Sequence, residues 1–232
     1  MLSRVGQNVL LGIAAVRILF NKFVVQRIFK KPPPIDWLDC KALCLGLDGA
    51  GKTSLVRHQC EVATTAAAVP TRAPVQPTSG FDVRTVVVPP DVKLEVWEVG
   101  GSKALRPFWN RYVDTSINAL VWVVDAADAS RLGESATELA NVLKAAPRLR
   151  RLPLLVLLNK ADLPGGQSSD ALQSALGLAS LQRNGPLRVA CTSSTDGREL
   201  EAALRWLADC ILGRGGTEQA PAPVSDVKVE RA

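Results

Sequence analysis

Histidine and closely spaced cysteine pairs, the usual ligands of zinc, are scarce in this sequence of 232 residues. It has a single histidine, His58, and five cysteines, none of which forms a C-x-x-C pair. Because zinc sites combine several Cys and His ligands at short spacings, we predict that the protein binds no zinc. The cysteines are expected to be reduced thiols of a cytosol-facing protein, and His58 to lie on a helix surface.

Acidic residues are absent from residues 1 to 35, which contain six basic ones. The rest of the chain carries 22 acidic and 22 basic residues, so this N-terminal arm accounts for the formal net charge of +6. A neutral domain lacks the basic face of a nucleic-acid-binding protein. We therefore expect no nucleic-acid partner.

A long uninterrupted apolar run is also missing, although residues 9 to 25 read VLLGIAAVRILFNKFVV. Its polar residues are Arg17, Asn21 and Lys22. The segment is interpreted as a membrane-spanning signal anchor with its basic flank, residues 22 to 31, in the cytosol, or as a helix in the membrane interface. A mitochondrial address and a buried core helix are two further interpretations. Leu2 follows the initiator Met where N-myristoylation needs glycine, which excludes that anchor.

Between residues 36 and 212, predicted strands alternate with predicted helices. Strands are expected at 40–47, 81–88, 92–99, 119–125, 154–159 and 187–191, and helices at 52–60, 130–146, 168–177 and 199–212. This order implies an α/β fold with a mostly parallel six-stranded sheet, one antiparallel strand and helices on both faces. Residues 61 to 77 are expected to form a loop. We divide the chain into a membrane-anchoring segment (1–35), a domain (36–212) and a Gly-, Pro- and charge-rich disordered tail (213–232).

The sequence from Gly46 to Thr53, GLDGAGKT, fits the phosphate-binding pattern G-x-x-x-x-G-K-[ST]. It follows a predicted strand and opens a predicted helix, so backbone N–H groups and the helix dipole would face the phosphates. Lys52 is expected to reach the β- and γ-phosphates, and the Thr53 hydroxyl to bind Mg²⁺. The nucleotide-binding residues predicted here are Asp48, Gly49, Ala50, Gly51, Lys52, Thr53 and Ser54.

A second motif, Asn159-Lys160-Ala161-Asp162, begins at the end of an apolar strand and resembles the guanine-reading motif of GTP-binding proteins. Guanine presents two adjacent donors that the Asp162 carboxylate can accept, whereas adenine would leave the carboxylate unpaired. The motif therefore disfavours an ATP-using kinase. We predict that Asn159, Lys160 and Asp162 bind the base. Cys191 and Thr192 lie at the end of the last predicted strand, where GTP-binding proteins have a Ser-Ala-x loop that touches the guanine, and the resemblance implies the same role for them.

Over residues 37 to 212, the sequence resembles the Arf-like (Arl) small GTPases. The resemblance is carried by GLDGAGKTS, Pro77-Thr78-x-Gly80-Phe81, W-x-V-G-G from Trp97, Arg106-Pro107-x-Trp109, Tyr112 and Val123-Val124-Asp125. It implies a P-loop small-GTPase fold, GTP or GDP with Mg²⁺ as cofactors, and action as a molecular switch.

The resemblance also implies individual roles. Thr78 would close on Mg²⁺ and the γ-phosphate, and Gly101 would donate its N–H to the γ-phosphate. The hairpin of residues 81 to 99 would slide between nucleotide states. Three aromatic residues, Phe81, Trp97 and Tyr112, match the family's effector-binding triad, although ordinary core packing also explains their spacing.

Two residues depart from the family pattern. Glu98 stands where the family usually has the Asp that holds Mg²⁺ through water, and its extra methylene would crowd or shift the metal. Ser102 stands where the family has the Gln that orients the attacking water. Losing such a preorganised group commonly costs on the order of 10²–10³ in rate. We therefore expect good GTP binding with very slow hydrolysis, which leaves open whether the protein acts as an enzyme. The 25 residues from Thr53 to Thr78, several more than the family usually has, are expected to loosen the link to Thr78.

Two functions remain open. The first is a monomeric, membrane-associated GTP switch in vesicle trafficking, bound to the membrane through residues 9 to 31. Its domain would face the cytosol from an endomembrane or the mitochondrial outer membrane, and it would act with an effector, an exchange factor and an activating protein. The second is a constitutively GTP-bound membrane subunit similar to the β-subunit of the signal-recognition-particle receptor. Ser102 favours the second function, and the intact aromatic triad favours the first.

Overall fold

The computed structural model describes residues 36–64, 76, 78–163, 168–193 and 198–214. The N-terminal arm, most of the predicted loop at 61 to 77 and nearly all of the predicted tail lie outside these residues, so the predictions made for them are not addressed by the structure. Among the described helices, none is both long and apolar enough to cross a membrane.

Six strands form one sheet in the order β2-β3-β1-β4-β5-β6. The strands are β1 (Leu38–Leu45), β2 (Phe81–Val88), β3 (Val92–Val99), β4 (Ala119–Asp125), β5 (Leu154–Asn159) and β6 (Leu187–Thr192). Only the β2–β3 pair is antiparallel, and the other four pairs are parallel. The predicted fold class is therefore confirmed.

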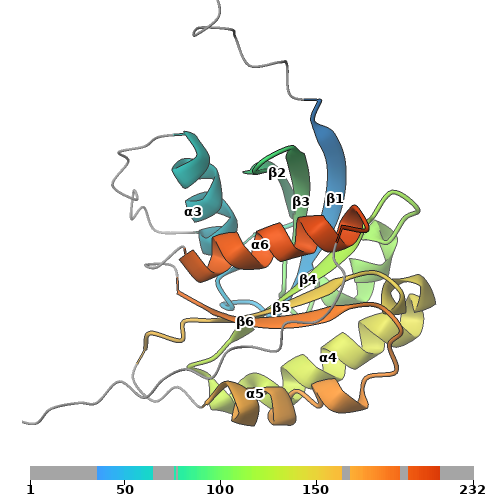
Figure 1. The fold of residues 1–232 in the computed structure, drawn as a ribbon. Coiled ribbons are helices and arrows are strands. Elements are labelled where there is room, and N and C mark those ends of the chain that lie inside the picture. The colour runs from blue at the N-terminus through green and yellow to red at the C-terminus, as the bar shows by residue number, and fades with distance from the viewer. Residues whose placement is uncertain (1–35, 65–75, 77, 164–167, 194–197, 215–232) are drawn as a thin grey trace, which may run out of the picture. The chain divides into compact units, whose positions relative to one another are not determined.

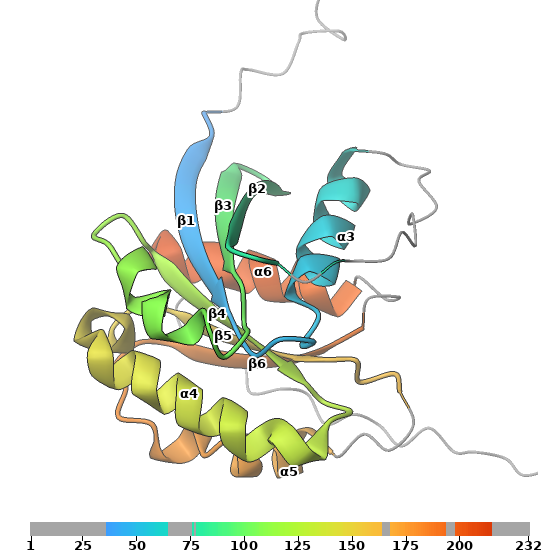
Figure 2. The same cartoon turned by 180° about the vertical axis from the view of Figure 1, so that it is seen from behind.

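Helices cover both faces of the sheet, as Figures 1 and 2 show. Helices α3 (Lys52–Thr64) and α6 (Arg198–Ile211) lie on one face, and α4 (Leu132–Ala145) and α5 (Ser169–Ala175) lie on the other. Short 3-10 helices are η2 (Arg106–Tyr112), η3 (Ala129–Arg131), η4 (Pro147–Arg150) and η5 (Leu178–Ser180). Each face has its own hydrophobic core, so the central strands are buried on both sides.

The central strands follow from their composition. Strands β4 and β5 read ALVWVVD and LLVLLN and are buried along almost their whole length, as expected of parallel strands covered on both faces. Helix α4 instead buries one stripe, which includes Leu132, Leu139 and Val142. Trp122 from β4 and Trp109 from η2 meet edge to face, with ring centroids 5.6 Å apart, and fix η2 over the sheet.

The structure corrects details of the sequence prediction. Strand β1 runs from Leu38 to Leu45 instead of 40 to 47, because the chain turns into the phosphate loop at Gly46, where φ is 147°. Helix η2 was not expected, since its short apolar stretch has no helical period. His58 is half-buried rather than fully on the surface. The five cysteines form no disulfide with one another.

Candidate functional site

The phosphate loop connects the end of β1 to the start of α3, at the edge of the sheet where the parallel strands end. Gly51 has φ of 90°, and a Cβ atom there would lie 2.2 Å from the Asn159 side-chain nitrogen. Only glycine fits this close approach between the loop and the end of β5. The loop places backbone N–H groups before the first turn of α3, which is the arrangement that binds phosphate.

Lys52 is held beneath this loop and is only 5% exposed. Its Nζ donates to the carbonyls of Gly46 and Leu47, each at 2.9 Å. Burial lowers the pKa of Lys52, and the nearby Cys44 and Glu98 oppose that effect. Because the two carbonyl partners are neutral, they orient the ammonium group and leave its charge to act on an anion in the loop.

Two threonines and one carboxylate converge beside Lys52. The hydroxyls of Thr53 and Thr78 both donate to Glu98 Oε1, the latter at 3.2 Å, and the two hydroxyl oxygens lie 3.2 Å apart. Glu98 is 2% exposed, and its Oε2 is a buried atom with no hydrogen-bond partner among the described residues. A carboxylate with an unused oxygen next to two hydroxyls fits a hard divalent cation such as Mg²⁺.

Gly101, at the end of β3, packs directly against the phosphate loop. Its carbonyl accepts from the Asp48 backbone N–H at 3.2 Å and from Arg106 Nε at 2.9 Å. A Cβ atom on residue 101 would lie 2.3 Å from the Gly46 carbonyl oxygen, so the contact requires glycine. The half-buried Ser102 follows at once, and its carbonyl accepts from Leu105 N at 2.9 Å.

An ion-pair network ties this segment to the phosphate loop and to α4. Arg106, with a side chain 6% exposed, pairs with Asp48 at 3.1 Å, Glu134 at 2.7 Å and Glu138 at 3.3 Å. Arg131 pairs with Asp48 at 2.8 Å and with Glu134 at 3.0 Å. Hydrogen bonds from Arg131 first, and also from Arg106, hold the pKa of Asp48 below its usual range.

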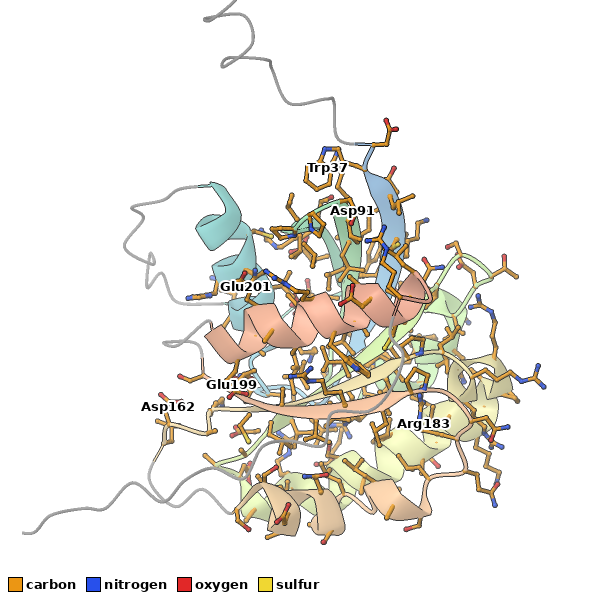
Figure 3. The ribbon with its side chains drawn as sticks, viewed as in Figure 1. Trp37, Asp91, Asp162, Arg183, Glu199 and Glu201 are labelled. Carbon is orange, nitrogen blue, oxygen red and sulfur yellow. The ribbon has the colours of Figure 1, made fainter. Side chains whose placement is uncertain are left out.

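The base motif lies at the same edge of the sheet. Asn159 Nδ2 donates to the Ala50 carbonyl at 2.8 Å, which joins the motif to the phosphate loop. Lys160 has φ of 64°, and its Nζ pairs with Asp125 Oδ2 at 2.5 Å. Asp162 is exposed at the carboxyl end of the sheet, where Figure 3 shows its side chain.

Residues at the end of β6 complete the edge. The Thr192 carbonyl accepts from the backbone N–H of Ala161 at 3.2 Å, so the two predicted base-binding segments are in contact. Thr192 is 2% exposed, and its hydroxyl has no partner among the described residues. Burial raises the pKa of the half-buried Cys191 thiol, which therefore stays protonated at neutral pH.

The aromatic triad forms a cluster on the surface beside β2 and β3. The Phe81 ring stacks on Trp97 with centroids 5.9 Å apart and meets the Tyr112 ring at 5.7 Å. Phe81 is 54% exposed, which core packing does not explain, whereas Trp97 and Tyr112 are partly buried against the core. The cluster therefore presents the exposed Phe81 ring as an apolar surface, and the partly buried Trp97 and Tyr112 support that ring.

Comparison with known proteins agrees with this architecture. Residues 34–211 match the model of the ADP-ribosylation factor family. The chain belongs to this family. It is an Arf-like small GTPase, and as such a member of a family of GTP-binding switches.

Similar Arf-family proteins come from distant organisms. The chain is 34% identical to ADP-ribosylation factor-like protein 3 of Chlamydomonas reinhardtii over 73% of its own length and 89% of that protein. It is 39% identical to ADP-ribosylation factor-like protein 1 of Caenorhabditis elegans over 74% and 88%. The structure of the Arl6 small GTPase of Trypanosoma brucei, solved with the nucleotide analogue GppNp, aligns with a TM-score of 0.64 and 26% identity, covering 77% of this chain and all of that one.

Sequence reasoning found the motifs of this Arf-like site but missed the residues that brace them. Arg131, Glu134 and Glu138 carried no motif, and Asp48 was predicted only as part of the phosphate loop. The one available signal was the helical spacing of Arg131 and Glu134, three residues apart. It could not show that Asp48, 83 residues away, completes the network.

Proposed function

We propose that this Arf-like protein is a membrane-associated guanine-nucleotide switch that binds GTP or GDP with Mg²⁺. The observation that carries the proposal is the convergence of Thr53 and Thr78 on Glu98. Thr53 lies in the first turn of α3, and Thr78 precedes β2, so this contact joins the start of α3 to the segment before β2. A cation and a γ-phosphate would be bound between them.

The phosphates are bound by groups already in place. Lys52 supplies a buried positive charge, the α3 N-terminus supplies its dipole, and the Gly101 backbone packs against the loop. Mg²⁺, held by Thr53, Thr78 and Glu98, would neutralise charge on the phosphate oxygens. Glu98 reaches the Thr53 hydroxyl directly, so its extra methylene brings the carboxylate up to the threonines.

The guanine base is read at the other end of the loop. The Asp162 carboxylate accepts the two adjacent guanine donors, and Asn159 braces this segment against Ala50. Lys160 extends over the base while its ammonium group pairs with Asp125. Cys191 and Thr192 border the same pocket.

Switching would follow from loss of the γ-phosphate. GTP holds Thr78, before β2, and Gly101, after β3, at the open end of the β2–β3 hairpin, and GDP releases both. Effectors would read the aromatic cluster of Phe81, Trp97 and Tyr112, whose exposed Phe81 ring offers an apolar contact.

GTP turnover by the protein alone is proposed to be very slow. Ser102 follows Gly101 at the place where the family has Gln, and its short side chain lacks the reach to position a water. An activating protein would have to supply that group. An exchange factor, which would release GDP, is a further expected partner.

Membrane attachment is assigned to residues 9 to 31, ahead of the GTP-binding domain (36–212) and the tail (213–232). The domain would face the cytosol from an endomembrane or the mitochondrial outer membrane and function as a monomer in vesicle trafficking. A constitutively GTP-bound membrane subunit is the second candidate, which Ser102 favours because such a subunit needs no turnover.

Single-turnover GTP hydrolysis by the full chain tests the proposal, with Ser102→Gln as the variant and Ser102→Ala as its matched control. We expect little hydrolysis by wild type and Ser102→Ala, and an increase of about tenfold or more in Ser102→Gln, equivalent to about 1.4 kcal/mol of barrier. Brisk hydrolysis by wild type would show that the interpretation of Ser102 is wrong.

Dissociation rates of GTP and GDP, measured on the same proteins, separate the two candidates. A switch releases both nucleotides slowly and exchanges them. A constitutive subunit retains GTP and binds GDP far more weakly, and in that case Ser102→Gln would also remain inactive.

A further inference from the structure

Two connections at the edge of the sheet opposite the nucleotide site, together with η4 and the ends of α4 and β6 that they join, carry only positive charge. Residues 144–153 and 181–188, which we call the basic loop pair, contain six basic residues and no acidic one. These residues are Lys144, Arg148, Arg150, Arg151, Arg183 and Arg188. Because residues 36 to 232 carry equal numbers of basic and acidic residues, those outside the basic loop pair have a net negative charge.

The two loops are joined to each other by hydrogen bonds. The Arg150 carbonyl accepts from the backbone N–H groups of Asn184 and Gly185 at 3.1 and 3.0 Å. Arg183 donates to the carbonyls of Leu149 and Leu152 at 3.1 and 2.6 Å. The basic loop pair is therefore one connected surface instead of two unrelated loops.

Three of its arginines, Arg148, Arg150 and Arg183, donate to neutral backbone carbonyls. Arg148 donates to the carbonyls of Asp114 and Thr115, both at 2.8 Å, and Arg150 Nε donates to the Leu143 carbonyl at 2.9 Å. Arg183 likewise bonds carbonyls, and burial alone lowers its pKa to about 10. Carbonyl partners fix a guanidinium group without cancelling its charge, so the positive potential extends into solvent.

Neighbouring acidic side chains have partners of their own. Asp91 forms a two-bond ion pair with Arg214, at 2.9 and 2.6 Å. The Asp114 carboxylate accepts from the backbone N–H and hydroxyl of Ser116, at 2.7 and 2.6 Å. Asp91 is neutralised by its ion pair, whereas Asp114 keeps its negative charge because its Ser116 partners are neutral. The six basic residues of the basic loop pair outnumber this one carboxylate.

The position of this surface points to its partner. In a parallel sheet the amino ends of the strands share one edge, so β5 and β6, which follow the two loops, begin at the same edge as β1. The basic, partly apolar N-terminal arm directly precedes β1 in the sequence. With strands about 4.8 Å apart, β1 and β5 are separated by about 10 Å, close to the screening length of about 8 Å at physiological salt.

We propose that the basic loop pair is a docking surface for anionic phospholipid headgroups. It would act together with the arm and hold the domain with its nucleotide edge directed away from the bilayer. Figure 3 shows Arg183 and Asp162 at opposite ends of the sheet, so this contact leaves the nucleotide site accessible. The inference rests on the membrane association proposed above and adds a second, electrostatic contact to it.

Vesicle co-sedimentation of the full chain tests the proposal. The loop variant is Lys144→Glu with Arg151→Glu, because both side chains are exposed. The control is Arg57→Glu with Arg205→Glu on α3 and α6, which changes the net charge equally. Each protein is measured with pure phosphatidylcholine vesicles and with vesicles containing phosphatidylserine, and bound GDP is quantified to verify the fold.

Binding to phosphatidylserine vesicles should fall at least about tenfold in the loop variant and stay near wild type in the control, since each basic side chain near an anionic membrane adds about 1 kcal/mol. Raising the salt from about 0.1 to about 0.5 M should remove that difference. Unchanged binding by the loop variant, or an equal loss in the control, would overturn the proposal. Phosphatidylcholine binding reports on the arm alone, so a failure of the arm and a failure of the loop pair are distinguishable.

Discussion

The two edges of the sheet use arginine in different ways. At the carboxyl edge, Arg106 is buried and pairs with three carboxylates, so its charge is neutralised within the protein. At the amino edge, Arg148 and Arg183 bond backbone carbonyls and keep their charge. The first arrangement fixes a binding site, and the second presents a potential to a partner. The groups that an arginine contacts, carboxylates or carbonyls, therefore decide whether its charge is neutralised or remains to act on a partner.

Removing Arg106 should produce the largest loss of stability. Arg106→Gln removes a buried cation that three partly exposed carboxylates share, and two of them keep Arg131 as a partner. The loss should therefore lie near the lower end of the about 3–5 kcal/mol that breaking a buried ion pair typically costs. Arg205→Gln is the matched control, because its exposed pair with Glu201 should contribute only about 0.3–0.5 kcal/mol. Urea unfolding of the GDP-bound proteins gives both values. Similar losses in the two variants would contradict the difference between buried and exposed pairs.

Lys52→Ala should come next, through nucleotide affinity. The variant loses charge-assisted bonds to the phosphates, each worth about 1.5–3 kcal/mol, so GDP affinity should fall about 100-fold or more. Lys144→Ala at the amino edge should bind GDP like wild type. Fluorescent-nucleotide titration measures both affinities. Equal affinity in Lys52→Ala and Lys144→Ala would show that Lys52 does not bind the phosphates.

The smallest expected effect is on the pH dependence of folding stability in acid. Hydrogen bonds from arginine lower the folded pKa of Asp48 below the unfolded value of 3.8. The stabilisation is complete above that pH and is lost as pH falls through the folded pKa. Asp48→Asn should therefore decline less steeply in stability below about pH 4 than wild type. Asp170→Asn, on the exposed first turn of α5, is the control that should keep the wild-type slope.

Most of the architecture could be predicted from local patterns. Each of these patterns depends only on residues that are close together in the sequence. They are the apolar runs of β4 and β5, the phosphate motif and the N-K-x-D motif. Braces such as Asn159 to Ala50, or Arg131 to Asp48, join residues more than 80 positions apart and leave no local pattern. Helix η2 was missed for a related reason, because the long-range packing of Trp109 on Trp122, not a helical period, holds it.

The β2–β3 hairpin reaches from one edge of the sheet to the other. Its open end carries Thr78 and Gly101 beside the phosphate loop, and its turn carries Asp91, paired with Arg214. Eight paired residues on each strand make it a stiff rod about 26 Å long. A slip of β3 by one residue against β1 would exchange its buried and half-buried faces, so only two-residue steps, about 7 Å, preserve the core. A shift of β3 that begins at the nucleotide would therefore move the hairpin turn at the amino edge as well, in steps of two residues.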